Sequence, residues 1–141
     1  MKNKLNIFYL ITLSLFIYSC SNSNNDRPIG QWDDNIKLSI KDVTFKSTSD
    51  SIIITTEGDW WWVIGISINN ENFEDFGGID VTSDNYTIEQ NGILIEKRDK
   101  NTLFIQADEN PLNIERKIIV QLEAGDYFDR VIITQNAAET D

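Results

Sequence analysis

The sequence contains no histidine among its 141 residues and only one cysteine, Cys20. Without histidine the chain lacks the commonest general base near neutral pH, the usual Ser-His triad and imidazole metal ligands. A lone cysteine cannot form a disulfide within the chain, so packing alone must hold the core. These absences predict a protein that is not an enzyme and that carries no metal and no cofactor.

Basic residues are also scarce, because 12 Lys and Arg stand against 23 Asp and Glu and the net charge is −11. An acidic surface repels phosphate backbones and anionic lipid headgroups. Nucleic acid is therefore not an expected partner.

The chain also lacks an apolar run of the roughly 20 residues that a transmembrane helix needs. Its one apolar stretch, residues 5–18, is short, contains polar residues and follows a basic start, which is the secretory pattern. The stretch ends in Ile17-Tyr18-Ser19-Cys20, which resembles a bacterial lipobox. The resemblance implies that Cys20 is lipidated and becomes the first mature residue.

Cleavage before Cys20 removes 19 residues, two of them lysines and none acidic, and leaves 122 residues with a net charge of −13. That length suits one domain. We expect a signal peptide at 1–19, a tether at 20–35, a folded domain at 36–136 and a tail at 137–141. Several acyl chains on Cys20 would hold the protein on the outer membrane, facing the surface or the periplasm. The alternative is a secreted protein with a free thiol.

Residues 36–136 carry the alternation of β-strands, bounded by turn residues. Asn91-Gly92 between two such runs predicts a hairpin with a type I′ turn. A one-residue change of phase near Lys41 and Asp42 predicts a bulge or kink. Seven to nine short strands favour an antiparallel β-sandwich over the alternative, a small barrel. The expected strands are 36–45, 51–56, 60–68, 87–90, 93–97, 103–107, 115–122 and 128–135.

Alternation also predicts which side chains point into the core. In the third strand we expect one face to carry Trp60, Trp62, Ile64, Ile66 and Ile68, and Trp61 to face outward. The other expected core pairs are Leu103 with Ile105, Ile118 with Val120, and Val131 with Ile133.

The last two expected strands have a familiar pattern. Residues 110–137 place an Asn at a turn, Arg116 at a strand start, a Gly in the next loop and a closing Ile-Ile-Thr-Gln that ends at Gln135. This pattern resembles the C-terminal signature of BACON-type domains, and the similarity covers roughly residues 36–136. BACON-type domains are Ig-like sandwiches, found largely in the Bacteroidetes, with a proposed carbohydrate-binding role. The resemblance marks Arg116 and Gln135 as structural positions; residues 68–85 depart from the family as an insertion.

Exposed aromatic residues are the candidate ligand contacts. Trp61 is the first of them, because it is expected to face outward and an indole face stacks on the C–H bonds of a sugar ring. Phe73 and Phe76 lie in a polar loop and would either cover the sheet or contact a ligand or protein partner. The alternative is that all of these rings are packed inside.

Adjacent carboxylates are common but do not indicate catalysis. Glycoside hydrolysis needs two carboxylates facing each other across a cleft, which neighbours in a strand or turn rarely provide. Asp80, Asp84 and Asn85 lack the spacing of a calcium loop. We therefore expect a non-catalytic, lipid-anchored envelope protein that recognises a glycan within a glycan-handling assembly. The alternative is a structural spacer or an adhesin-like subunit that binds a protein partner.

Overall fold

The computed structural model describes residues 32–139, and they form nine β-strands and no helix. No helix that could cross a membrane is found within that range. The strands are β1 (Asp42–Phe45), β2 (Asp50–Thr55), β3 (Trp62–Ile68), β4 (Glu71–Phe73), β5 (Tyr86–Gln90), β6 (Ile93–Arg98), β7 (Thr102–Ala107), β8 (Arg116–Ala124) and β9 (Tyr127–Gln135).

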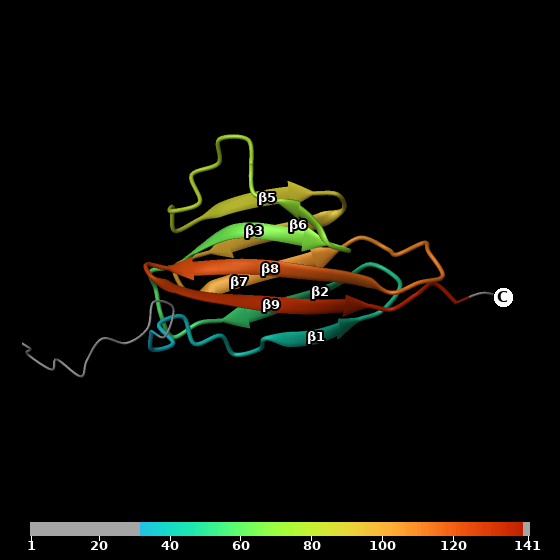
Figure 1. The fold of residues 1–141 in the computed structure, drawn as a ribbon, viewed down its shortest axis with the longest axis horizontal. Helices are drawn as coiled ribbons and strands as arrows, with labels where there is room; N and C mark the ends of the chain where they lie inside the picture. The colour runs from blue at the N-terminus through green and yellow to red at the C-terminus, as the bar shows by residue number, and fades with distance from the viewer. Residues whose placement is uncertain (1–31, 140–141) are drawn as a thin grey trace, which may run out of the picture.

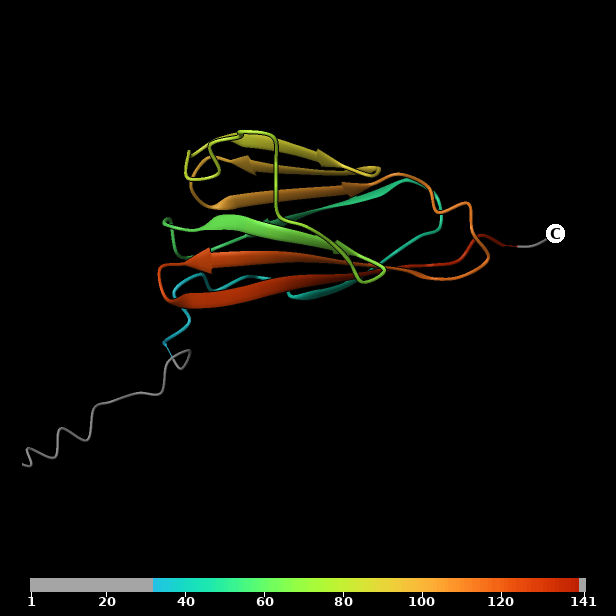
Figure 2. The same ribbon diagram turned by 45° about the horizontal axis from the view of Figure 1, so that its top comes forward.

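The strands form two sheets that pack face to face (Figures 1 and 2). One sheet has the order β1-β9-β8-β3-β4 and the other the order β2-β7-β6-β5. All pairs are antiparallel except β1 with β9. This is an Ig-like β-sandwich. The predicted fold class is confirmed, and the barrel alternative is wrong because the two sheets are separate.

The first part of the domain belongs to both sheets. Leu38 forms an isolated bridge with Thr56, next to β2, whereas β1 runs parallel to β9 in the other sheet. The chain changes sheets between these two pairings. The chain bends at Lys41, so the kink that was one of the two predicted explanations is present, whereas the predicted bulge is not. The phase shift marks a crossing between sheets.

Three hairpin turns follow the chemistry of their residues. Asn91 and Gly92 both have positive φ, 47° and 75°, which confirms the predicted type I′ turn. Gly125 begins the two-residue loop between β8 and β9 with a φ of 63°. The loop between β3 and β4 is Asn69-Asn70, with φ values of 48° and 72°. The inserted segment 68–85 thus begins with a hairpin that the sequence analysis missed, and then crosses to β5 in the other sheet (Figure 2).

Most of the predicted core is confirmed. The pairs Leu103 with Ile105, Ile118 with Val120, and Val131 with Ile133 are all fully buried.

The prediction for β3 is largely wrong. Of the five residues expected inside, only Ile66 is fully buried, and Trp61 and Val63 lie inside instead. The register shifts between Val63 and Gly65, so a bulge at Ile64 lets both halves of the strand face inward.

One end of the sandwich is joined by Arg116 and Gln135. The Arg116 Nε–H donates to Gln135 Oε1 at 2.8 Å. Gln135 is fully buried, and its amide nitrogen donates to the carbonyls of Asp108 (2.9 Å) and Thr48 (3.3 Å). The two side chains thus tie β8 and β9 to the loops beside them.

Candidate ligand-binding face

Trp61 is the central buried side chain at one end of the sandwich, only 1% exposed. Its indole N–H donates to Thr56 Oγ1 at 3.0 Å. Lys97, itself 3% exposed, holds its ammonium 4.6 Å from the centre of the indole and donates to the Trp61 carbonyl at 2.6 Å. Burial lowers the pKa of Lys97. Trp61 cannot stack on a ligand, so its assignment as a binding residue is wrong.

Because Trp61 points inward, its two neighbours point outward. Trp60 is 67% exposed and Trp62 is half-buried. Their ring centroids lie 5.1 Å apart, with the planes at 77°. A Cβ on Gly125 would lie 3.2 Å from the Trp60 ring, so this ring lies over the β8–β9 turn. Two indoles therefore form a corner at the start of β3.

A third aromatic residue lies on the same outer face. Trp62 is the register partner of Glu123 in β8, which in turn is the partner of Phe128 in β9. Register partners on one face of a sheet are side-by-side neighbours. Phe128 is 59% exposed. The glutamate therefore lies between two rings that are separated by about 10 Å, two strand spacings.

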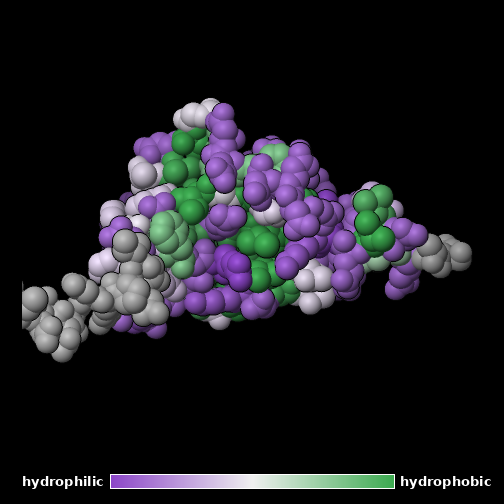
Figure 3. Space-filling model, in the orientation of Figure 1, coloured by the Kyte–Doolittle hydropathy of each residue, from purple (hydrophilic) through white to green (hydrophobic). Residues whose placement is uncertain are grey.

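A hollow of about 440 Å³ opens on this face next to Phe128. Figure 3 shows apolar side chains over the middle of β8 and β9, with hydrophilic groups around them. Gly65 is the register partner of Gln121 and leaves that position on β3 without a side chain. A Cβ there would meet Gln121 Oε1 at 3.4 Å and Glu74 Cγ at 3.6 Å. The hollow is lined by Ile64, Ile119, Gln121, Leu122, Phe128, Asp129 and Arg130.

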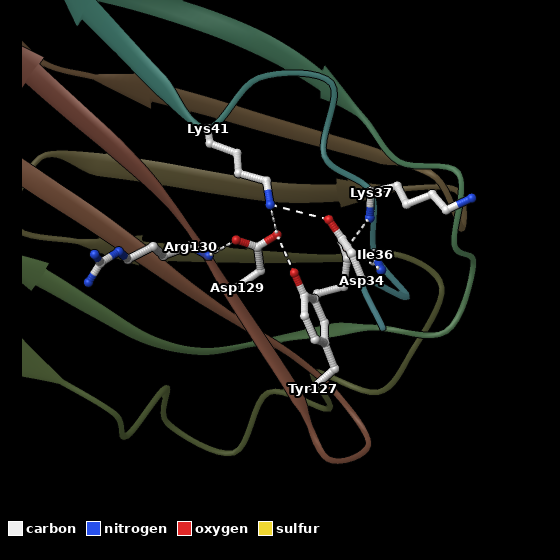
Figure 4. Close-up of polar contacts among 7 residues, drawn as sticks. All are labelled: Asp34, Ile36, Lys37, Lys41, Tyr127, Asp129 and Arg130. Carbon is white, nitrogen blue, oxygen red and sulfur yellow. Dashed lines mark hydrogen bonds and ion pairs between the residues drawn. The ribbon is translucent and has the colours of Figure 1, made fainter. Parts of the chain in front are cut away.

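A polar cluster joins β9 to the segment before β1 (Figure 4). Lys41 Nζ lies 2.7 Å from Asp129 Oδ2 and 3.2 Å from Asp34 Oδ2, and the Tyr127 hydroxyl donates to Asp129 at 3.3 Å. The hydrogen bond to Asp129 raises the pKa of Lys41. Burial, with Asp129 close by, raises the pKa of Tyr127 to about 12. Asp129 is thus already neutralised by a lysine.

Asp34 fixes the N-terminal end of this cluster. Its Oδ1 accepts from the backbone N–H groups of Ile36 (3.1 Å) and Lys37 (2.7 Å). Burial alone would raise the pKa of Asp34, but these bonds and the one from Lys41 leave it below its usual value. Lys41 therefore ties the segment before β1 to β9.

Phe73 and Phe76 do not belong to this face. Phe73 is half-buried and is the register partner of Ile66, which faces the core. Phe76 packs against the core from the loop between β4 and β5. Their predicted contact with a ligand stays a prediction, at a place separate from the Trp60–Trp62 corner.

The remaining candidates serve local structure or lie outside the described residues. Asp80 accepts from the backbone and hydroxyl of Thr82, and Asn85 accepts from the Asp99 N–H. Within residues 32–139 no three acidic side chains gather as metal ligands. Cys20, the predicted lipidation site, lies outside the part of the chain that the structure describes.

Sequence reasoning missed Trp60, Trp62, Phe128 and Gln121 as members of one face. The signal for β8 and β9 was available, because Gln121 and Phe128 alternate with the predicted core residues. For the tryptophans no local signal was available, since residues 60–64 are apolar at every position.

No protein-family model matches the chain, and no match is found among curated proteins. Among solved structures, the fold is similar to the NMR structure of a protein from Bacteroides thetaiotaomicron, with a TM-score of 0.61 and 19% sequence identity. The match covers 81% of this chain and 97% of that one. At this level of identity the similarity supports the β-sandwich fold alone.

Proposed function

We propose that this chain is a non-catalytic, lipid-anchored envelope protein that recognises a glycan on the outer face of the five-stranded sheet. The observation that carries the proposal is the Trp60–Trp62 corner beside a hollow with polar lining. The face of an indole attracts the C–H bonds of a sugar, and amide and carboxylate groups orient its hydroxyls. Gln121 and Glu123 are placed for that task.

The rigidity of the site also supports binding. The aromatic and polar groups stand on neighbouring strands of one sheet, so little ordering accompanies the arrival of a ligand. The BACON-like pattern around Arg116 and Gln135 and the lipobox ending in Cys20 fit a module of a surface glycan-handling assembly on the outer membrane.

Titrating the full-length lipoprotein with glycans, followed by tryptophan fluorescence and calorimetry, tests the proposal. Trp62→Ala should weaken binding by about tenfold or more, because truncation of a central aromatic anchor typically costs about 2 kcal/mol. Trp60→Ala should do the same. Ile53→Ala, an exposed apolar residue on the opposite sheet, is the matched control and should leave binding unchanged. Equal binding by all three variants would contradict the assignment.

The anchor has its own test. Mass spectrometry of the protein purified from membranes should show a chain that begins at Cys20 and carries acyl groups. Cys20→Ala should leave the chain unprocessed and without acyl groups. An unmodified thiol at Cys20 in the native protein would contradict this part of the proposal.

A second candidate function, binding of a protein partner, is favoured by a different observation. Leu112 and Ile114 are 53% and 59% exposed in the loop between β7 and β8. This loop lies at the end of the sandwich opposite to the start of the described chain (Figure 1). Exposed apolar pairs of this kind occur at interfaces. Crosslinking at position 112 in cells, compared with position 53, would reveal such a partner.

A further inference from the structure

The arrangement of the two indoles restricts which glycans this face can take. We infer that it binds a neutral, soluble glycan chain and not the flat surface of an insoluble polysaccharide. This inference rests on the proposed function and narrows it.

The first argument is the angle between the rings. A planar polysaccharide surface requires aromatic rings that lie in one plane, so that each ring meets a sugar of the same sheet. The Trp60 and Trp62 planes meet at 77°, with centroids 5.1 Å apart. A flat surface laid on one indole meets the edge of the other. Only a ligand that turns around the corner, or a chain end that enters it, can contact both.

The second argument is the depth of the face. The hollow beside Phe128 has a volume of about 440 Å³. Gln121 lines it, and Glu123 stands between Trp62 and Phe128. The flat surface of an insoluble polysaccharide could not reach these polar groups, whereas the hydroxyls of a single glycan chain can enter the hollow and form hydrogen bonds with them.

The third argument is charge. The carboxylates near the hollow are Glu123, Glu74 beside Gly65, and Asp129, and Lys41 neutralises Asp129. Arg130 is the cation in the lining. Two carboxylates thus stand against one guanidinium, on a chain whose net charge is −11. Glycans that carry carboxylate or sulfate groups are repelled, and neutral glycans are not.

The full-length lipoprotein in detergent can be tested against three sets of probes. The first set is soluble and neutral (mixed-linkage β-glucan, α-mannan and arabinoxylan), the second is soluble and acidic (polygalacturonate), and the third is insoluble (microcrystalline cellulose and chitin). Affinity electrophoresis measures the soluble probes, and sedimentation measures the insoluble ones. We expect retardation by at least one neutral soluble probe, with a loss of tenfold or more for Trp60→Ala and Trp62→Ala.

The outcomes separate the two proposals. Binding of cellulose, chitin or polygalacturonate that depends on Trp60 and Trp62 would overturn this inference and leave the proposed glycan recognition in place. No binding of any probe, or binding that neither tryptophan variant weakens, would overturn the proposed function itself. Ile53→Ala serves as the control for each probe.

Discussion

The two outer faces of the sandwich carry similar residues but present them differently. On the five-stranded sheet, Glu123 lies between Trp62 and Phe128. Among residues 32–139 this glutamate forms no ion pair, and Phe128 stays open to solvent. On the four-stranded sheet, Phe104 lies between Ile53 and a second glutamate, Glu96.

On the four-stranded sheet, the side chain of Arg98 covers the aromatic ring. Glu96 accepts from the Arg98 Nε–H at 2.6 Å, and the guanidinium lies 3.9 Å from the centre of the Phe104 ring. The arginine therefore covers the ring and neutralises the acid. An outward aromatic residue is thus not a binding site by itself: what matters is whether the chain covers it with its own side chains, and on the five-stranded sheet it does not.

Removing the support beneath the open face should have the largest effect on stability. Trp61→Ala would leave a cavity and strip Lys97 of its cation–π partner, so we expect a loss of about 3–5 kcal/mol in the free energy of unfolding. Chemical denaturation measures it. Trp60→Ala is the matched control, one residue away and exposed, and should cost less than about 1 kcal/mol. Equal losses would mean that Trp61 is not the inward residue.

Removing a hydrogen bond between the two sheets should have the next largest effect on stability. The Tyr86 hydroxyl, on β5, accepts from the Val63 N–H at 3.0 Å beside the bulge in β3. Tyr86→Phe leaves that N–H without its partner and should cost about 1–3 kcal/mol at pH 7.

The same residue gives a pH dependence. Burial raises the pKa of Tyr86 from its ordinary value of 10.0 to about 12, so the fold favours the neutral phenol. This contribution to stability is full below pH 10 and is lost as the pH rises from about 10 to about 12. The free energy of unfolding should fall over this window, and less steeply in Tyr86→Phe. An identical slope in the variant would contradict the assignment.

Weakening the polar cluster of Lys41, Asp34 and Asp129 should have a smaller effect on stability. Lys41→Met leaves Asp129, whose side chain is 9% exposed, without its cation. Because the Lys41 side chain is itself 43% exposed, we expect a loss on the order of 1–2 kcal/mol. Lys37→Met removes a solvent-exposed pair with Glu57 and should produce no measurable change. The difference between the two variants, measured at low and high salt, isolates the contribution of the cluster.

Uncovering the closed face should have the smallest effect. Arg98→Ala exposes Phe104 and should cost about 0.5–1 kcal/mol, the usual range for an exposed cation–π contact. If the open face owes its binding to the Trp60–Trp62 corner, the variant should gain no affinity for glycans. If the uncovered Phe104 face bound glycans as tightly as the five-stranded sheet does, any uncovered aromatic ring would be sufficient for binding.

The sequence was sufficient for most strands because alternation in β7, β8 and β9 is regular and turn residues separate them. It could not set the phase of β3, where residues 60–64 are apolar throughout. That phase depends on partners far along the chain: Lys97 on β6, and Thr56, which accepts from the indole of Trp61. The same long-range contacts decide that Trp60 and Trp62 point outward, so this face could not be predicted from the local sequence. Lys97 itself gave a signal, since it shares the inward parity of Ile93 and Ile95.

The parallel pairing of β1 with β9 has a mechanical consequence. Four residue pairs, from Asp42 with Ile132 to Phe45 with Gln135, join the strand that follows the N-terminal segment to a strand of the open face. If the lipid holds one side and a glycan the other, a pull between them runs along both strands. Their hydrogen bonds are then sheared together and do not peel apart one after another. This geometry should raise the force needed to unfold the domain when it is pulled between its membrane anchor and its ligand.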